Sequence, residues 1–432
     1  MARTGLIGPG PQPSPDGKDP AAPLAAVPPA APRRSLRTYL APGESGALTV
    51  VLGLVVIGAI FQSLNGHFLS PVNLTDLLVQ GAVFMLLGMG EVFALLLGDI
   101  DLSIGFVSGI AGVVTAELVT GARPWPWWAA IAAALMVTTA IGALQGTLIA
   151  RLRLPSFVVT LAGLLACQGV IIWILGSGGT LQIPSNVIND LANGYLTPAA
   201  GWLLMVASVG LFAVVTMRRD AERRAGGAAG PPASLTAAKI GAAAAAGIAV
   251  VAVCNVNRGV LSPARGVPWV VLIVLGVLVA WSFLLNRTRF GRDVHAIGSN
   301  AEAARRAGVG LARIRTVAFA LAGLTAGVAG IVYASELRSV SSGTDGATLV
   351  LYAVAAAVIG GTSLFGGRGK PLDGVLGGLV IAAIYNGIYL LGMSAAAQDL
   401  IFALVLLAAV AADALARRAR TSRRPRADRV PR

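Results

Sequence analysis

The stretch LLVQGAVFMLLGMGEVFALLLGDIDLSIGFVSGIAGVV (residues 77–114) contains two long apolar runs on either side of a turn with Asp99 and Asp101. An α-helix needs roughly 20 apolar residues to cross about 30 Å of hydrocarbon, and comparable runs recur from Leu48 to Leu415. The whole chain is 56% hydrophobic and 12% charged, whereas a soluble domain has about 25% charged residues. The sequence therefore predicts an all-α protein, a bundle of transmembrane helices.

The apolar runs predict about twelve spans, within a range of 10 to 12. The spans between 237 and 285, especially AAAAAGIAVVAVC, are alanine-rich and marginally hydrophobic, so the count is least certain there. The expected spans are 48–66, 74–97, 101–120, 126–150, 156–175, 200–217, 237–254, 268–285, 314–334, 347–362, 372–391 and 397–415.

Basic residues provide a test of this count, because cytoplasmic loops of membrane proteins are enriched in Arg and Lys. With the N-terminus inside, the basic clusters all fall on the cytoplasmic side: 151–153, 218–224, 286–293, 367–370 and the C-terminal tail. We therefore expect both termini in the cytoplasm and a multi-pass protein of the cytoplasmic membrane. The net charge of +14 is explained by topology, so we expect no nucleic-acid partner.

Composition divides the chain further. Residues 1–44 are rich in Pro, Gly and Ala and predict a disordered cytoplasmic tail. A transmembrane domain is expected over 45–416, followed by a basic cytoplasmic tail over 417–432. Within this domain, the Gly- and Pro-containing segment 218–236 predicts a flexible cytoplasmic linker, and 286–313 predicts a large cytoplasmic loop.

Enzyme motifs are absent from the sequence. It contains no Walker A, GxSxG or HExxH motif and no Cys/His cluster. We therefore expect no catalytic residue, no metal site and no cofactor bound by this chain.

The loop at 286–313 contains a short helix with its own end signals. Asn300 is a good N-cap, Glu302 lies in the first turn, and Arg305 and Arg306 lie in the last turn before Gly308. A capped helix between two spans, too short to cross a membrane, suits a surface that receives a push from a soluble partner. The alternative from composition alone is an ordinary structured loop.

The two aspartates of the opening stretch allow two interpretations. At a cytoplasmic turn, Asp101 can accept hydrogen bonds from the first amides of the following helix. Alternatively, the turn is a gate or hinge, in which Asp99 pairs with an arginine of the cytoplasmic loops. The candidate gate residues are Gly98, Asp99, Asp101, Ser103 and Gly105. A proton relay has less support, because no histidine or lysine accompanies these acids.

Three stretches together resemble one known family. GDIDLSIG (98–105) is similar to its GGIDLSVG signature, GRDVHAIGSNAEAARRAGV (291–309) to its cytoplasmic coupling loop, and GGTSLFGGRGKPLDGVLGGLVIAAIYNGIYLLGM (360–393) to its glycine-rich C-terminal hairpin. The family is that of the ATP-binding-cassette (ABC) sugar importer permeases of the ribose and xylose class, and the chain is nearer the xylose type. Asp99 departs from the pattern, since glycine is usual at that place.

The resemblance implies a permease that moves a monosaccharide across the cytoplasmic membrane. ATP and Mg²⁺ would bind to a separate cytoplasmic ATPase subunit, an extracytoplasmic sugar-binding protein would deliver the sugar, and two permease chains would form a homodimer in the lipid bilayer. The residues it implies for coupling to the ATPase are Gly291, Arg292, Gly298, Asn300, Glu302, Ala303, Ala304, Arg305 and Gly308.

A sugar passage needs hydroxyl, amide and aromatic surface. Glu91 is the carboxylate clearly inside a span, so we expect it to face protein or a wet cavity. The other candidates for the pathway are Gln168, Trp173, Tyr352, Tyr385 and Asn386, each of which could equally serve helix packing.

Two other functional classes remain open from the sequence alone. An ion-coupled secondary transporter of a small polar solute would need a coupling-ion site, and the scarcity of intramembrane charge argues against proton coupling but not against sodium coupling. A membrane enzyme could use paired aspartates, although Asp99 and Asp101 lie in one short turn.

Overall fold

A computed structural model of the chain describes residues 46–226, 232–259, 264–343, 346–394, 396–405, 407–408 and 411. The predicted tails at 1–44 and 417–432 lie outside these residues. The regular secondary structure of the described residues is helical apart from two three-residue strands, which confirms the all-α class. Its elements are α2 (Gly46–Leu64), α3 (Pro71–Leu96), α4 (Ile104–Thr120), α5 (Trp127–Leu152), α6 (Ser156–Leu175), β1 (Thr180–Gln182), α7 (Asn186–Asn193), α8 (Pro198–Ala225), α9 (Ala233–Asn255), α10 (Trp269–Arg287), α11 (Arg289–Ser299), α12 (Ala301–Arg306), α13 (Leu311–Leu337), β2 (Ser339–Ser341), α14 (Gly346–Gly360) and α15 (Pro371–Leu390).

An apolar helix stands at each of the twelve predicted spans. Eight of these helices are long and apolar enough to cross a membrane. The four shorter ones are Thr49–Leu64, Ile104–Thr120, Gly346–Gly360 and Ala396–Val405. Because a helix rises 1.5 Å per residue, the 17 residues of α4 extend only about 25 Å. The short helices therefore belong to a polytopic bundle in which not every helix crosses the full hydrocarbon thickness.

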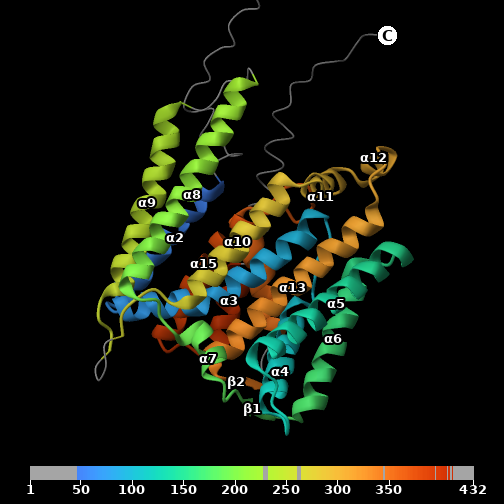
Figure 1. Cartoon of the computed structure of the whole chain (residues 1–432), viewed down its shortest axis with the longest axis horizontal. Helices are drawn as coiled ribbons and strands as arrows, with labels where there is room; N and C mark the ends of the chain where they lie inside the picture. Colours follow the sequence, from blue (N-terminus) through green and yellow to red (C-terminus); the bar gives the residue numbers. More distant parts are fainter. Residues whose placement is uncertain are drawn as a thin grey trace, which may run out of the picture.

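Helix α3 forms the centre of the bundle, with α13, α14 and α15 packed around it (Figure 1). Every residue from Gly81 to Leu96 is buried. A helix that is apolar on all sides needs such a central position, because it has no polar face for water.

Small residues allow the helices around α3 to approach closely. Gly88 of α3 faces Gly374 of α15, and Gly142 of α5 faces Phe319 and Ala320 of α13. Without a hydrophobic force between helices in lipid, such close backbone packing supplies much of the attraction. The high glycine content thus serves the core as well as the turns.

Helices α8 and α9 form a hairpin at the edge of the bundle (Figure 1). The sequence predicted a flexible linker at 218–236, whereas α8 continues to Ala225 and α9 begins at Ala233. The Arg, Ala and Glu residues of this segment favour a helix. The Thr236 hydroxyl also donates to the Asp220 carboxylate at 2.5 Å, which joins the two helices. The predicted linker is therefore much shorter than expected.

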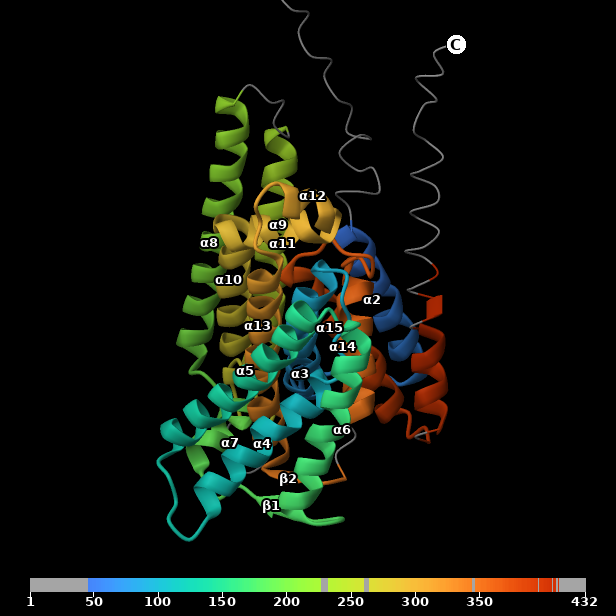
Figure 2. The same cartoon turned by 90° about the vertical axis from the view of Figure 1, so that its right-hand side faces the viewer.

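The two ends of the bundle carry different structures (Figure 2). At one end, called the α12 end, α11 and α12 lie beside the end of α3. The opposite end, called the β1 end, carries α7 and the antiparallel pair β1–β2, in which Thr180 faces Ser341. The sequence analysis did not predict α7, the strands or α11. The amphipathic spacing of Val294 and Ile297, both buried, was an available signal for α11.

Close helix packing predicts different results for two glycine substitutions. A Cβ at Gly377 of α15 would overlap the carbonyl oxygen of Ala356, whereas a Cβ at Gly169 of α6 meets nothing within 4 Å. We expect Gly377→Ala to lower the free energy of unfolding by about 1–3 kcal/mol through overpacking. Gly169→Ala should leave it unchanged or raise it slightly. Melting temperatures of both variants in detergent, followed by fluorescence-detected size exclusion, test this; equal losses would contradict it.

Candidate functional site

The turn between α3 and α4 lies inside the bundle. The sequence predicted a cytoplasmic turn at GDIDLS and a span beginning at residue 101, whereas α4 begins at Ile104. Asp101 is only 2% exposed, and its amide donates to Glu91, five residues before the end of α3. We call residues 97–103 the break. They turn back along α3, so that Asp101 lies beside Glu91, about 7 Å along the helix axis before the end of α3. The predicted turn between the two helices is therefore present, and partners inside the bundle satisfy its polar groups.

Asp101 and Ser103 form the inner part of the break. The Asp101 carboxylate accepts the backbone amide of Ser103 at 2.9 Å and the Ser103 hydroxyl at 2.6 Å. The side-chain amide of Gln145, on α5, donates to that hydroxyl at 2.9 Å. Asp101 thus holds an amide just before α4, close to its predicted capping role, while Gly105 packs in the first turn of α4 against Gly346.

Asp99 forms the outer part of the break. Its carboxylate accepts a hydrogen bond from Arg315 Nε at 2.7 Å. Arg315 lies in the first turns of α13, directly after the loop that contains α11 and α12. The predicted pairing of Asp99 with an arginine is therefore present, and it joins the break to the helix that follows this loop.

Glycines from three separate parts of the sequence meet where α11 ends. The Gly367 amide donates to the Leu96 carbonyl at 2.9 Å. A Cβ at Gly298 would overlap that same carbonyl, and Gly366 packs against Gly98 and Gly298. Gly98 and Gly366 have φ values of 78° and 83°, which favour glycine. We call Gly98, Gly298, Gly366 and Gly367 the glycine junction.

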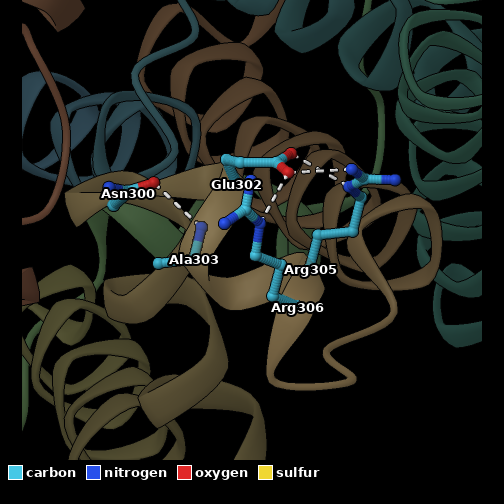
Figure 3. A network of polar contacts seen from close by, with 5 residues as sticks. All are labelled: Asn300, Glu302, Ala303, Arg305 and Arg306. Carbon is cyan, nitrogen blue, oxygen red and sulfur yellow. Dashed lines mark hydrogen bonds and ion pairs between the residues drawn. The ribbon is translucent and has the colours of Figure 1, made fainter.

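Helix α12 projects its charged side chains away from the bundle (Figure 3). The Asn300 carboxamide oxygen accepts the Ala303 amide at 2.9 Å, so the predicted N-cap is formed. Glu302 accepts hydrogen bonds from Arg305 at 2.8 and 3.0 Å and from Arg306 at 3.1 Å. Arg305, followed by Arg306, lowers the pKa of Glu302, so this face keeps fixed charges near neutral pH.

The other predicted coupling residues anchor this helix pair or border it. Ala304 of α12 is buried, in one apolar cluster with Val294 and Ile297 of α11 and Leu96 of α3. Gly291 is buried against Leu285, and Arg292 is exposed. Gly308 has a φ of 83° and lies two residues after the end of α12.

The predicted pathway residues do not converge on one site. Tyr352 and Tyr385 lie in an aromatic cluster with Phe84 and Phe402. Asn386 accepts from Asn73 at 2.7 Å and donates to Gln80 at 3.3 Å, which is the arrangement of helix glue.

The remaining pathway candidates lie elsewhere. Gln168 is half-buried on α6, and Trp173, also on α6, is 85% exposed on the outer surface of the chain. Glu91 faces protein, as expected, beside Asp101. Whether any of these residues contacts a transported solute stays a prediction.

Two hollows border the site and the β1 end. A cavity of about 30 Å³ lies where Gly105, Ser108 and Gly112 of α4 face α13. A depression of about 350 Å³ at the β1 end is lined by Gln182, Ile183, Pro184, Asn189, Leu337, Arg338 and Ser339. None of the predicted pathway side chains lines either hollow.

Sequence analysis missed Gln145, Arg315 and Gly366 as parts of this site. Gln145 had a signal, since it is a polar residue inside the apolar run AIGALQGTLIA. Arg315 and Gly366 had no comparable local sequence signal, because their roles depend on which distant segments of the chain pack together.

Comparison with known proteins places this geometry in context. A family model described as "branched-chain amino acid transport system / permease component" matches residues 73–410. The chain is 35% identical to the xylose transport system permease protein XylH of Escherichia coli (strain K12) over 82% of this chain and 88% of that protein. It is 30% identical to the D-allose permease AlsC of the same strain, over 84% of this chain and 90% of that protein.

A further relative is the ribose import permease RbsC of Escherichia coli (strain K12). It is 30% identical, over 84% of this chain and 92% of that protein. No solved structure matches the chain.

The ion pair between Asp99 and Arg315 predicts unequal effects of removing each partner. Arg315→Ala leaves a carboxylate that is only 10% exposed, whereas Asp99→Gly leaves an arginine that is 27% exposed and can reach water. We expect Arg315→Ala to lower the free energy of unfolding by about 2 kcal/mol and Asp99→Gly to lower it by less. The double variant should recover most of the loss. Thermal unfolding of the three variants tests this, and purely additive losses would contradict it.

Proposed function

We propose that this chain, which belongs to the branched-chain amino acid transport system / permease component family, is the membrane permease of an ATP-driven importer of monosaccharides. The observation that carries the proposal is the glycine junction. It joins the end of α11, which leads into the exposed, capped α12, to the last residue of α3 and, through Gly366, to Gly98 of the break, so a push on α12 can reach a polar site inside the bundle.

The cargo follows from the relatives. The family description names branched-chain amino acids, but the relatives that match most of this chain are named for xylose, D-allose and ribose. The highest identity among these three is to the xylose permease. We infer a pentose or hexose as substrate, with xylose as the first candidate.

The energy source is a second protein. The chain has no Walker A motif, so ATP and Mg²⁺ bind to a cytoplasmic ATPase subunit that docks on α12. An extracytoplasmic sugar-binding protein delivers the substrate at the β1 end, which places the α12 end in the cytoplasm. Two copies of the chain form the working permease in this proposal.

The route of force is short. Val294 and Ile297 of α11 pack in one apolar cluster with Leu96 at the end of α3. Arg315, at the start of α13, holds Asp99. Movement of α12 would therefore reach the break through both ends of its loop, through Gly298 on one side and through α13 on the other.

An ion-coupled secondary transporter is the competing proposal. It needs a coupling-ion site, and the described residues contain no group of three or more His, Cys, Asp or Glu side chains that could hold a metal ion. A secondary transporter also has no need for the exposed, capped α12 helix, which suits the docking of a soluble partner. A membrane enzyme that uses paired aspartates has equally little support, because the Asp99 carboxylate forms an ion pair with Arg315.

The docking role of α12 is tested by co-purification. We expect a nucleotide-binding subunit to co-purify with the native chain from detergent-solubilised membranes and to be lost, at least tenfold, from Glu302→Ala/Arg305→Ala. The reason is that this double change removes the charged face of α12 and leaves Asn300 as its cap.

The matched control is Glu222→Ala/Arg287→Ala. It removes another exposed glutamate–arginine pair, 3.5 Å apart at the ends of α8 and α10, and should retain the subunit. Equal retention or equal loss in both double variants would argue against docking on α12.

Cargo and energy source are tested by reconstitution. Proteoliposomes that contain the chain with its co-purified ATPase and binding protein should accumulate radiolabelled D-xylose only when ATP is supplied, and should not accumulate leucine. Leucine uptake without sugar uptake would contradict the proposed cargo. Sugar uptake that persists without ATP would favour the secondary transporter.

A further inference from the structure

Glu91 is a buried carboxyl group with an incomplete set of partners. Its exposed fraction is 0%, and it lies on α3 beside the break. Oε1 accepts the Asp101 amide at 3.2 Å, which directs the side chain toward the break, while Oε2 has no hydrogen-bond partner. A buried carboxylate oxygen without a donor is unfavourable, so this atom points to a missing ligand.

Other acidic side chains near Glu91 increase the cost of burying a negative charge there. The break adds Asp101, itself almost fully buried, and Asp99, which is paired with Arg315 of α13. The neighbouring side chains of α5 and α6 are Gln145 and the Cys167 thiol, neither of them a cation. Among the described residues no cation forms an ion pair with Glu91 or Asp101, and two such charges cannot both remain ionised in a low-dielectric interior.

Hydrogen bonds distinguish the two acids. Asp101 accepts two donors from Ser103, at 2.9 and 2.6 Å, which stabilise its ionised form. Glu91 accepts one longer bond, on Oε1 alone. The acid with fewer donors is the one that keeps a proton when neighbouring carboxyl groups compete.

We propose that Glu91 is a proton-binding site, a neutral carboxylic acid protonated on Oε2, and that Asp101 is the carboxylate of the pair. The proton removes one of the two buried charges and thereby allows the break to lie inside the bundle. A metal ion fits less well, since the Ser103 hydroxyl and the Gln145 amide are already used within the break. This inference does not depend on what the chain transports.

Infrared spectroscopy of the full-length protein in lipid nanodiscs tests the inference without any transport assay. A protonated carboxyl group has a C=O stretch that a carboxylate lacks. At pH 7 an unperturbed glutamate, whose pKa is about 4.3, is ionised and gives no such band. We expect the native chain to show the band, and Glu91→Gln, which keeps the size and the neutral charge of the side chain, to lose it.

The matched control is Glu336→Gln. Glu336 lies at the end of α13 and is half-buried, so it is the other glutamate of the described residues that is not exposed. Its replacement should leave the Glu91 band in place. Asp101→Asn should likewise keep the band, because the proton is assigned to Glu91.

A second measurement leaves Glu91 itself unchanged, in case Glu91→Gln does not fold. The chain with Glu44→Gln and Glu336→Gln is labelled with ¹³C at the glutamate side-chain carboxyl. Its other glutamates, Glu117, Glu222 and Glu302, are exposed. A protonated-carboxyl band that shifts with this label therefore belongs to Glu91.

Two results would overturn the proposal. Absence of a label-sensitive band at pH 7 would mean that Glu91 is ionised. A band that does not shift with labelled glutamate and disappears in Asp101→Asn would place the proton on Asp101.

Discussion

The arrangement of this bundle depends on satisfying the polar groups of a non-helical segment inside a membrane protein. Lipid offers no hydrogen bonds, so irregular backbone at that depth must find partners in the protein. The break does so on four helices. Asp101 meets Glu91 of α3, Asp99 meets Arg315 of α13, Ser103 meets Gln145 of α5, and Thr160 of α6 donates to the Ile100 carbonyl. The break is consequently a structural centre of the fold as well as a candidate gate.

Close packing around this centre explains why glycine recurs in three separate motifs. The ends of α3 and α11 and the turn before α15 approach so closely that a Cβ at Gly298 would overlap the Leu96 carbonyl. Contacts of this kind transmit displacement with little slack, because packed interiors are nearly incompressible. Flexible side chains at the same contact would absorb part of the displacement by changing rotamer.

Much of the fold could be predicted from hydrophobic periodicity, because long apolar runs in a membrane protein are restricted to helices. The α12 cap was predictable too, since Asn300, Glu302 and Gly308 act within one short segment. Long-range partners were not: Arg315 lies 216 residues from Asp99, and no local pattern links them. The burial of the break could not be predicted either, because it depends on partners from distant helices that allow Asp99 and Asp101 to lie inside the bundle.

The α8–α9 hairpin lies at the edge of the bundle (Figure 1), and the only buried residues of α8 are Gly201 and Asp220. Two antiparallel helices return the chain to the side from which it started. Such a pair can lengthen or shorten a permease without inverting whatever follows, whereas a single added helix would carry α12 to the opposite face. Because the hairpin contains an even number of helices, its presence leaves α12 on the side of the bundle where the rest of the chain places it.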